Sequence, residues 1–395
     1  MTLNSKNEHM EKHLRILFLA FRDARNPFNG GGDIYLSELA KGCVNQGHDV
    51  TFVSSRFPGS KAEESVNGVR IVRFGSAFTM VFVLFFYYFI HLRGRFDVVV
   101  EDVLSGPRIP FLGSLYIRER IVGIIFQRQK ELFQRQFSYL VAFAMSSVER
   151  LLVLAYRRKA IVVDSLRVKK DLQAIGYEAN KMTVVHPGVP ESFLAQTGLP
   201  PFSERPLQVL CLTKLRRYKL IEDAIFAIKN VRKILPECQL VIAGRTNEMD
   251  PGYEEELHNL VNCLNLNENV RFIKDETLQE KVELLASSRV LVLPSALEGF
   301  GIVVIEANAH GTPVVASDGV PADAALNGYN AIVVPRNDIT AFSAAIFSLL
   351  TDRKRWNLMS HNSVEWATHF SLNSAAEKFL SVLKGQDVED SPALV

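Results

Sequence analysis

Short apolar runs of strand length alternate with longer amphipathic stretches along the first half of the chain. Residues 14–21 and 49–54 are predicted strands, and 34–46 between them has apolar residues near helical spacing. The alternation continues with expected strands at 70–74, 98–100, 121–125, 160–164 and 182–185 and an expected long helix at 137–156. A helix between two strands carries the chain back across the sheet, so such strands pair in parallel. This pattern predicts a doubly wound α/β sheet.

A second series of the same kind follows a break in this pattern. At 395 residues the chain is too long for one ordinary hydrophobic core. The alternation stops near 186–189, and the proline-containing stretch 198–206 is typical of a linker. Expected strands then lie at 208–213, 239–243, 270–273 and 290–295, with helices at 221–234, 253–264 and 277–286. We therefore predict two Rossmann-like, doubly wound parallel-sheet domains that face a cleft, divided into residues 1–190, a linker at 191–206, residues 207–370, and a C-terminal part at 371–395.

Overall composition excludes a strongly charged binding protein. The chain is 48% hydrophobic and 22% charged, as expected of a folded globular protein, and its net charge of +2 gives no general attraction to nucleic acid. Residues 93–170 differ, since they hold 15 Lys or Arg against 7 Asp or Glu. This stretch either faces an anionic surface or distributes its charges over several solvated helix faces.

Two further features bear on where the protein works. The four cysteines have neither a metal-ligand spacing nor the pattern of a small disulfide framework, so reduced thiols are expected. The N-terminal residues 1–13 are polar and lack the apolar core of a signal peptide. We therefore expect a cytoplasmic protein.

One apolar segment complicates that expectation. Residues 77–90 contain no charge, but they are too few to span a bilayer comfortably, which takes about 20 apolar residues. Three alternatives remain open: a helix buried between the sheet and its neighbours, which we favour; a membrane-surface element with aromatic residues in the lipid interface; and a true membrane span. The second alternative would make the protein peripheral on the inner face of the membrane.

A carboxylate and glycine segment carries most of the functional information. Glu298, Gly299, Phe300 and Gly301 follow the expected strand at 290–295 and precede an expected helix at 302–310. A helix start after a glycine turn offers free backbone N–H groups and a positive helix end to an anion such as phosphate. Glu306 in that helix and Glu298 before it would approach one ligand from different sides, unless both are ordinary surface residues. A sugar nucleotide has both the phosphate and the hydroxyl groups to use them.

Three other loops follow predicted strands, where ligands of parallel sheets collect. In the first domain, Gly30 and Gly31 belong to a glycine-rich turn at 29–33 that lets the backbone approach a ligand closely. In the second domain, four cations crowd into 214–219, and of these Lys214 and Lys219 are the better candidates for binding a diphosphate. Gly244 ends the next strand and would line the same crevice. The alternatives are ordinary glycine turns and a solvated basic loop.

Three motifs in these segments are similar to those of retaining glycosyltransferases of family 4, which have the GT-B fold of two Rossmann-like domains. The motifs are Glu298-Gly299-Phe300-Gly301 through Glu306-Ala307 with His310-Gly311-Thr312-Pro313-Val314-Val315-Ala316, then Thr213-Lys214-Leu215 with Lys219, and then Gly30-Gly31 with Asp33, Leu39, Gly47-His48 and Val50-Thr51. The resemblance covers most of the chain and is weaker between residues 75 and 158. It also implies that the helix after Phe370-Ser371 crosses back to the first domain.

The resemblance implies roles for the candidate residues. Lys214 and Lys219 would contact the diphosphate of a nucleotide sugar and Glu306 its ribose, while Glu298 would lie beside the donor sugar. No metal or other cofactor is expected, because the two cations neutralise the diphosphate. Two positions depart from the family pattern: Lys214 replaces an arginine, which loses bidentate geometry but keeps the charge, and Phe126 stands where many relatives have a histidine near the reacting sugar.

We therefore expect an enzyme that moves a sugar from a nucleotide-diphosphate sugar to a carbohydrate or lipid-linked acceptor with retention of anomeric configuration. Its partners would be the nucleotide sugar and the acceptor, and no nucleic acid. The apolar and basic segments would add contact with the membrane surface. Two alternatives stay open. One is another reaction on the same fold, such as sugar-nucleotide epimerisation or glycan phosphorolysis, and the other is a nucleotide-binding scaffold without turnover.

Overall fold

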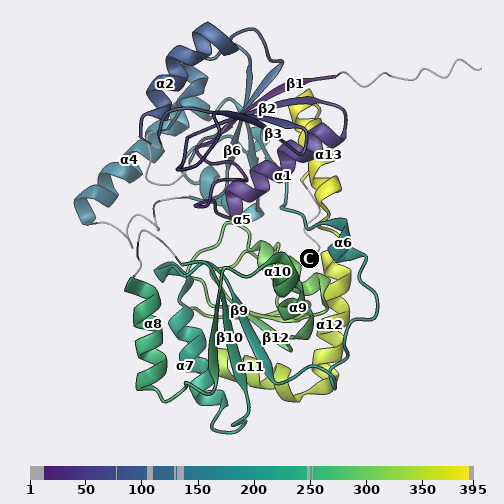
Figure 1. Ribbon diagram of the computed structural model, residues 1–395. Helices are drawn as coiled ribbons and strands as arrows, with labels where there is room; N and C mark the ends of the chain where they lie inside the picture. Colours follow the sequence, from purple (N-terminus) through teal and green to yellow (C-terminus); the bar gives the residue numbers. More distant parts are fainter. Residues whose placement is uncertain are drawn as a thin grey trace, which may run out of the picture.

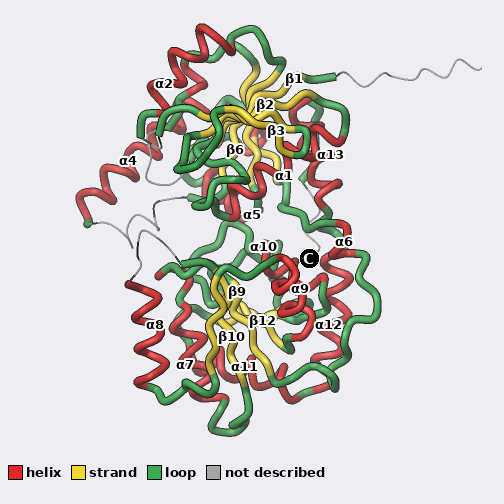
Figure 2. The backbone as a smooth tube through the Cα atoms, in the orientation of Figure 1, coloured by secondary structure: helices red, strands yellow, loops and turns green. Residues whose placement is uncertain are grey.

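The computed structural model describes residues 13–76, 78–104, 110–128, 130, 138–246, 250 and 252–390. Two α/β domains lie one above the other in Figure 1, and each is built on one sheet with helices on both faces (Figure 2). The fold predicted from the alternating pattern is therefore confirmed.

The sheet of the first domain has eight strands in the order β3-β4-β2-β1-β5-β6-β7-β8. The β3–β4 pair is antiparallel, and the other pairs are parallel. The strands are β1 Arg15–Leu19, β2 Asp49–Ser54, β3 Glu63–Val66, β4 Val69–Arg73, β5 Val98–Asp102, β6 Arg120–Ile125, β7 Ala160–Val163 and β8 Met182–Val184. The edge strand β3 was not predicted, because Glu63-Glu64-Ser65-Val66 has too little apolar character to indicate a strand.

Helices on this sheet begin at recognisable residues. The α5 helix starts after Ser165, whose hydroxyl accepts a hydrogen bond from the backbone N–H of Val168, a common N-cap arrangement. The helical elements are α1 Gly31–Asn45, α2 Met80–Tyr87, the π-helical turn η1 Tyr88–Leu92, the 3-10 turn η2 Gly113–Leu115, α4 Tyr139–Tyr156, α5 Leu166–Gln173 and the 3-10 turn η3 Ala179–Lys181.

The sheet of the second domain has six parallel strands in the order β11-β10-β9-β12-β13-β14. The strands are β9 Gln208–Leu212, β10 Gln239–Gly244, β11 Val270–Lys274, β12 Val290–Leu293, β13 Val314–Ser317 and β14 Ala331–Val334. The helical elements are the 3-10 turn η4 Arg217–Lys219, α7 Ile221–Val231, α8 Gly252–Cys263, α9 Leu278–Ser287, α10 Ile302–Ala309, α11 Ile339–Thr351 and α12 Arg353–Ala367. The chain leaves β9 on one side to form β10 and β11 and returns to its other side as β12, so the strand order reverses between β9 and β12.

The chain passes between the domains at two adjacent points. The Val189 N–H donates to the carbonyl of Phe370, and the Val189 carbonyl accepts a hydrogen bond from the Leu372 N–H. Val189 lies just before the short helix α6 Glu191–Leu194, and Leu372 begins α13 Leu372–Lys384. The α13 helix then lies against α1, where a Cβ on Gly42 would clash with Ala376. Its apolar side chains join the core of the first domain with Phe18 and Phe52. In Figure 1, α13 is the yellow helix beside the first sheet.

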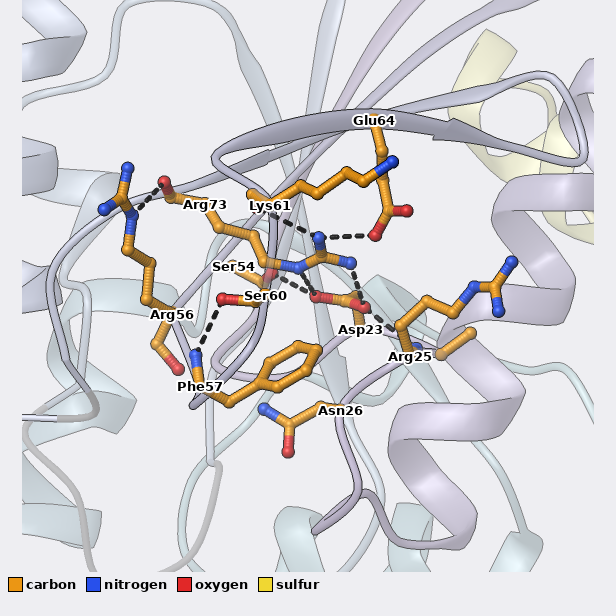
Figure 3. Close-up of polar contacts among 12 residues, drawn as sticks. Asp23, Arg25, Asn26, Ser54, Arg56, Phe57, Ser60, Lys61, Glu64 and Arg73 are labelled. Carbon is orange, nitrogen blue, oxygen red and sulfur yellow. Dashed lines mark hydrogen bonds and ion pairs between the residues drawn. The ribbon is translucent and has the colours of Figure 1, made fainter.

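A buried ion pair holds the loops at the carboxyl ends of β1, β2 and β4. The guanidinium of Arg73 donates to both oxygens of Asp23 at 2.6 and 2.8 Å, and it also pairs with Glu64 at 2.5 Å (Figure 3). Ser54 donates to Asp23 at 2.5 Å as well. Burial alone would raise the pKa of Asp23, but the bonds from Arg73 and Ser54 more than offset this and lower it. This bidentate pair therefore fixes the edge of the first sheet that faces the cleft.

The favoured interpretation of the apolar segment at 77–90 is wrong in part. Ala77 lies outside the described residues, and the rest forms α2 and most of η1. Met80, Leu84 and Tyr88 are buried against the sheet, as a core helix requires, but Phe82, Phe86 and Ile90 are 62%, 65% and 70% exposed. The helix therefore lies on the surface of the first domain, with an outer face that is also apolar.

Candidate functional site

The loops after β9, β10 and β12 meet at the carboxyl edge of the second sheet, where the strand order reverses. The Thr213 N–H donates to the carbonyl of Ala243 at 2.9 Å, and the Ala296 N–H donates to the carbonyl of Tyr218 at 2.8 Å. These bonds join the basic loop at 213–219 to its neighbour on each side. The candidates from three separate sequence segments therefore lie in one place, as expected where ligands bind parallel sheets.

Two glycines have conformations that the site requires. Gly244 has φ of 142°, and a Cβ there would clash with the carbonyl oxygen of Thr213. Gly301 has φ of 93° and is the residue from which α10 begins. Gly244 thus permits close contact between the loops after β9 and β10, and Gly301 provides the turn that points the start of α10 at the site.

Lys219 and Glu298 form an ion pair at the centre of this edge. The Lys219 ammonium donates to Glu298 Oε1 at 2.5 Å, and the two side chains are 13% and 12% exposed. Burial alone would lower the pKa of Lys219, but the Glu298 carboxylate more than offsets this, so the pKa is raised. The lysine therefore stays charged and is available to an anion that competes with the glutamate.

Lys214 connects the basic loop to the first domain. Its ammonium donates to the carbonyl oxygen of Asn29 at 2.6 Å, directly before Gly30 and Gly31. Burial, followed by the positive charge of Arg216, lowers the pKa of Lys214 to about 8. A Cβ on Gly31 would meet no atom within 4 Å, so the first turn of α1 is open beside this lysine. The structure thus brings the glycine-rich turn and the basic loop together.

Glu306 has a cationic partner that the sequence did not indicate. Lys281 on α9 donates to Glu306 Oε1 at 2.6 Å, and the glutamate side chain is 13% exposed. Glu306 is therefore a half-buried residue with a fixed position, which differs from the exposed surface glutamate that we held as the alternative. In contrast, Arg217 turns away from the site and pairs with Asp250 and Glu256, with 53% of its side chain exposed.

Gly299 and Phe300 contact the first domain and the interior rather than open space. A Cβ on Gly299 would lie 2.6 Å from Asp164 Oδ2 and closer still to the carbonyl oxygen of Phe126. The Phe300 side chain is buried and stacks on His186 with ring centroids 5.3 Å apart. Only backbone atoms of these two residues remain for a ligand.

Three titratable residues at the domain interface were absent from our candidates. Asp164 follows β7 and is buried, and burial raises its pKa well above the ordinary range, with Asp323 and Glu298 raising it further. His186 lies 3.0 Å from the Asp164 carbonyl oxygen, and burial lowers its pKa. Asp323 accepts a hydrogen bond from the Leu166 N–H at 2.6 Å. The position of Asp164 at the carboxyl end of a strand was the signal that could have found it.

Phe126 lies between the glycine-rich turn and the segment at 298–301. A Cβ on Gly32 would be 2.8 Å from its ring, which also contacts Tyr35 at 6.0 Å between centroids. An apolar ring thus occupies the place where the family pattern puts a histidine. Among the residues that the structure describes, no three His, Cys, Asp or Glu side chains are grouped as a metal site would need.

Comparisons with known proteins agree with this architecture. Residues 29–193 match the model of Glycosyltransferase Family 4, and residues 200–366 match that of Glycosyl transferases group 1. The chain is 30% identical over 177 residues to glycogen synthase of Mycobacterium tuberculosis, covering 42% of the chain and 41% of that protein. It is 32% identical over 173 residues to the GDP-mannose-dependent alpha-(1-6)-phosphatidylinositol monomannoside mannosyltransferase of Mycolicibacterium smegmatis, covering 42% of the chain and 44% of that protein. The chain thus matches a little under half the length of these curated relatives.

Solved structures share the fold over nearly the whole chain. Sucrose-phosphate synthase from Thermosynechococcus elongatus is 19% identical with a TM-score of 0.78, covering 94% of this chain and 98% of that one. Anabaena HepE in complex with UDP and glucose is 18% identical with a TM-score of 0.72, covering 94% of this chain and all of that one, 100%. Because the two family models cover both domains and the solved structures share the GT-B arrangement, this chain belongs to the group 1, family 4 glycosyltransferases.

Proposed function

We propose that the protein transfers a sugar from a nucleotide-diphosphate sugar to a carbohydrate or lipid-linked acceptor with retention of anomeric configuration. The observation that carries this proposal is the arrangement of Lys214, Lys219, Glu298 and Glu306 at one edge of the second sheet, opposite the glycine-rich turn. Two ammonium groups would pair with the negative charges of a diphosphate, and two carboxylates would accept hydrogen bonds from the sugar hydroxyl groups on either side of it. The acceptor would enter from the first domain.

Each residue has a defined part in this reaction. The bond between the anomeric carbon and the diphosphate breaks, a bond from that carbon to an acceptor oxygen forms, and the acceptor hydroxyl gives up its proton. Lys219, Lys214 and the start of α10 stabilise the negative charge that builds on the leaving diphosphate. With retention, the acceptor attacks the face from which the diphosphate leaves, so a leaving phosphate oxygen is placed to receive the proton. Glu306 holds the ribose, and Glu298 orients the donor sugar.

The two lysines supply the positive charge that a divalent metal would otherwise bring, so we propose that the reaction needs no metal. The Mycolicibacterium relative is named for a mannosyl transfer to a phosphatidylinositol mannoside, which supports a lipid-linked acceptor as one of the two classes. HepE was solved with UDP-glucose, which supports a nucleotide-sugar donor. We place the reaction in the cytoplasm, with peripheral contact at the inner face of the membrane.

Thermal stability with UDP, GDP, ADP and dTDP in turn tests the donor site. A nucleotide at 100 times its dissociation constant stabilises the folded state by about 2.7 kcal/mol, which is visible as a higher melting temperature. We expect one nucleotide to stabilise the wild type, with the effect reduced in Glu306→Ala and unchanged in the control Glu377→Ala, an exposed residue on α13. Equal stabilisation of both variants would contradict the ribose assignment.

Incubation of the donor without an acceptor separates the alternative functions. An epimerase converts its donor alone, whereas a transferase gives at most slow hydrolysis to the free sugar. A glycan phosphorylase would release a sugar phosphate from a glycan and inorganic phosphate. Phe126 at the expected histidine position favours one other alternative, a scaffold that binds nucleotide without turnover. Such a scaffold would be stabilised by nucleotide but would form no product with any member of a broad acceptor panel.

A further inference from the structure

Exposed large apolar side chains concentrate on one part of the first domain. Among the described residues, fifteen of the nineteen exposed large hydrophobic side chains lie between residues 78 and 154. The other four, Ile34, Ile234, Leu278 and Leu358, are far apart in the chain. Scattered apolar side chains are ordinary on a protein surface, but a contiguous group of this size marks an interaction site.

Among the exposed residues of α2 and η1, only His91 is polar, whereas a solvent-facing helix usually carries many polar residues. The inner side of α2 and η1 places Met80, Leu84, Tyr88 and Leu92 in the core at four-residue spacing. The outward apolar side chains are Phe82, Val83, Phe85, Phe86, Phe89 and Ile90, each with 39% to 70% of its surface exposed. An amphipathic surface helix would have charges there, so this helix requires an apolar partner on its outer side.

This surface continues onto α4. Tyr116 lies beside Phe85 with ring centroids 5.1 Å apart, and the neighbouring Leu115 of η2 is 69% exposed. The Tyr156 hydroxyl at the end of α4 contacts the same η2 turn through the Ser114 N–H at 3.4 Å. Figure 1 shows α2 and α4 on the same side of the first domain. The apolar face of the first domain, as we define it, comprises the exposed apolar side chains of α2, η1, η2 and α4, which on α4 are Tyr139, Leu140, Val141, Phe143, Val148, Leu151 and Leu154.

The charges around this face have one sign. In the described part of 78–159, six arginines are exposed and not bound to α13, namely Arg93, Arg95, Arg118, Arg150, Arg157 and Arg158; Arg120 is also exposed, but it donates to the α13 carbonyls of Val382 and Leu383 on the other face of the sheet. Each acidic side chain in the same part is buried or half-buried. Glu119, for example, accepts hydrogen bonds from the Tyr88 hydroxyl and the Gly94 N–H. A partner of this face therefore meets apolar and cationic groups together, which is the chemistry of an anionic lipid interface.

The α4 helix has the length and composition of a membrane span but is held within the fold. It has 18 residues with a mean hydropathy of 1.4 over them. Leu152, Val153 and Tyr156 nevertheless pack in the core of the first domain, and the Tyr156 hydroxyl donates to Glu101 at 2.5 Å. Spanning a bilayer would remove these side chains from the core, whereas lying on the bilayer surface leaves them in place.

We propose that the apolar face docks the protein peripherally on an anionic lipid surface, with its phenylalanines in the headgroup region and the surrounding arginines on lipid phosphates. This inference deepens the proposed function, on which it rests for the lipid-linked class of acceptor. The docked domain is the one that we assign to the acceptor, so an acceptor carried by the membrane would be presented to the domain that takes it up.

Vesicle flotation without any nucleotide tests the docking. We expect the full chain to float with vesicles of phosphatidylcholine and phosphatidylglycerol at low salt, and to float much less with phosphatidylcholine alone. Because each phenylalanine removed loses apolar burial in the interface, the variant Phe82→Ser/Phe86→Ser should bind about tenfold more weakly or worse. The matched control Ile234→Ser/Leu358→Ser removes two exposed apolar side chains of the second domain and should float like the wild type.

A second pair of variants tests the arginines. Arg157→Gln/Arg158→Gln should weaken binding to the anionic vesicles and reduce its dependence on salt, whereas Arg353→Gln/Lys354→Gln on α12 should change neither. Melting temperatures of all variants near that of the wild type show that folding is intact. Nucleotide stabilisation of Phe82→Ser/Phe86→Ser should equal that of the wild type, which separates a failure of docking from a failure of the donor site.

Four results would overturn the proposal. The wild type does not float with anionic vesicles, or Phe82→Ser/Phe86→Ser floats as well as the wild type. Alternatively, the protein is a dimer in light scattering that Phe82→Ser/Phe86→Ser converts to a monomer, which assigns the face to a second copy of the chain. Binding that survives both high salt and alkaline carbonate would show an integral span and would equally contradict peripheral docking.

Discussion

The ammonium of Lys219 lies 2.5 Å from Oε1 of Glu298, although 79 positions separate the two residues in the chain. The pair joins the η4 turn after β9 to the loop that leads from β12 into α10. Both side chains are nearly enclosed, and the Glu298 carboxylate more than offsets the effect of burial on Lys219, so the pKa of the lysine is raised. A diphosphate entering the site would compete with Glu298 for the lysine, and the freed glutamate would then be available to the donor sugar.

Glu298→Gln should destabilise the protein without nucleotide by about 3 kcal/mol, because it leaves the Lys219 charge buried without its partner. A nucleotide diphosphate that supplies a new anion should restore part of this loss. The measurement is chemical unfolding with and without the stabilising nucleotide. Glu256→Gln, which breaks the exposed pair with Arg217, is the control and should leave stability unchanged. Equal effects of the two substitutions would mean that the Lys219 pair is only a surface contact.

Nucleotide affinity should decline at alkaline pH because the pKa of Lys214 is about 8. Titration calorimetry with the preferred nucleoside diphosphate should give about tenfold weaker binding at pH 9 than at pH 7, since the neutral amine no longer attracts the diphosphate. Lys214→Arg should remove most of this dependence, because arginine stays charged throughout the range. A wild-type affinity that is constant from pH 7 to 9 would exclude Lys214 from the diphosphate site.

The same pKa predicts a change in stability without nucleotide. The folded state releases the Lys214 proton near pH 8, whereas the unfolded chain holds it to about 10.5. Between these values the unfolded state binds more protons, so the contribution of Lys214 to stability increases with pH. Denaturant unfolding of the wild type and of Lys214→Met from pH 7 to 10 measures this contribution. The difference between the unfolding free energies of the two proteins should change in that pH range.

Gly299→Ala should reduce transfer more than tenfold while nucleotide binding is largely kept. The added methyl group would collide with the carbonyl oxygen of Phe126 and with Asp164 Oδ2, both on the first domain, and would push the domains apart. Misplacing reacting groups by about 1 Å is enough to cost this much rate. Gly252→Ala, where a Cβ meets no atom within 4 Å, is the matched control and should keep full activity. Full activity of Gly299→Ala would mean that the reaction does not need this contact.

Glu101→Gln should stabilise the protein at pH 8 and leave it unchanged near pH 4. Burial raises the pKa of Glu101 to about 7, although Tyr156 donates to it. A carboxyl with a raised pKa contributes stability below its unfolded value of 4.5 and loses that contribution as the pH rises through 7. The neutral amide avoids this loss, a gain of about 3 kcal/mol at pH 8. Unfolding of Glu101→Gln and of the exposed control Glu63→Gln at both pH values measures it, and a gain of equal size at pH 4 would contradict the assignment.

The apolar segment at 77–90 illustrates where periodicity is insufficient. With an uncharged run of residues, hydrophobic spacing cannot distinguish an inner face from an outer face, because both are apolar. Met80 and Leu84 are buried and Phe82 and Phe86 are exposed, yet nothing in their side-chain chemistry separates the two pairs. The first sheet decides this, since it covers only one side of the helix.

By itself the sequence determined the two sheets, apart from the antiparallel edge strand β3, and the place of Lys214, Lys219, Glu298 and Glu306 at the carboxyl edge of the second sheet. Local apolar periodicity specifies strands and helices, and the carboxyl ends of parallel strands meet at one edge, so residues that follow strands converge there. Only the tertiary structure decided that Lys281 pairs with Glu306, that Lys214 reaches the carbonyl of Asn29, and that Asp164 approaches Gly299. These contacts join separate elements or separate domains, and their distances depend on how the two sheets are packed and how closely the domains approach, which no local pattern of residues encodes.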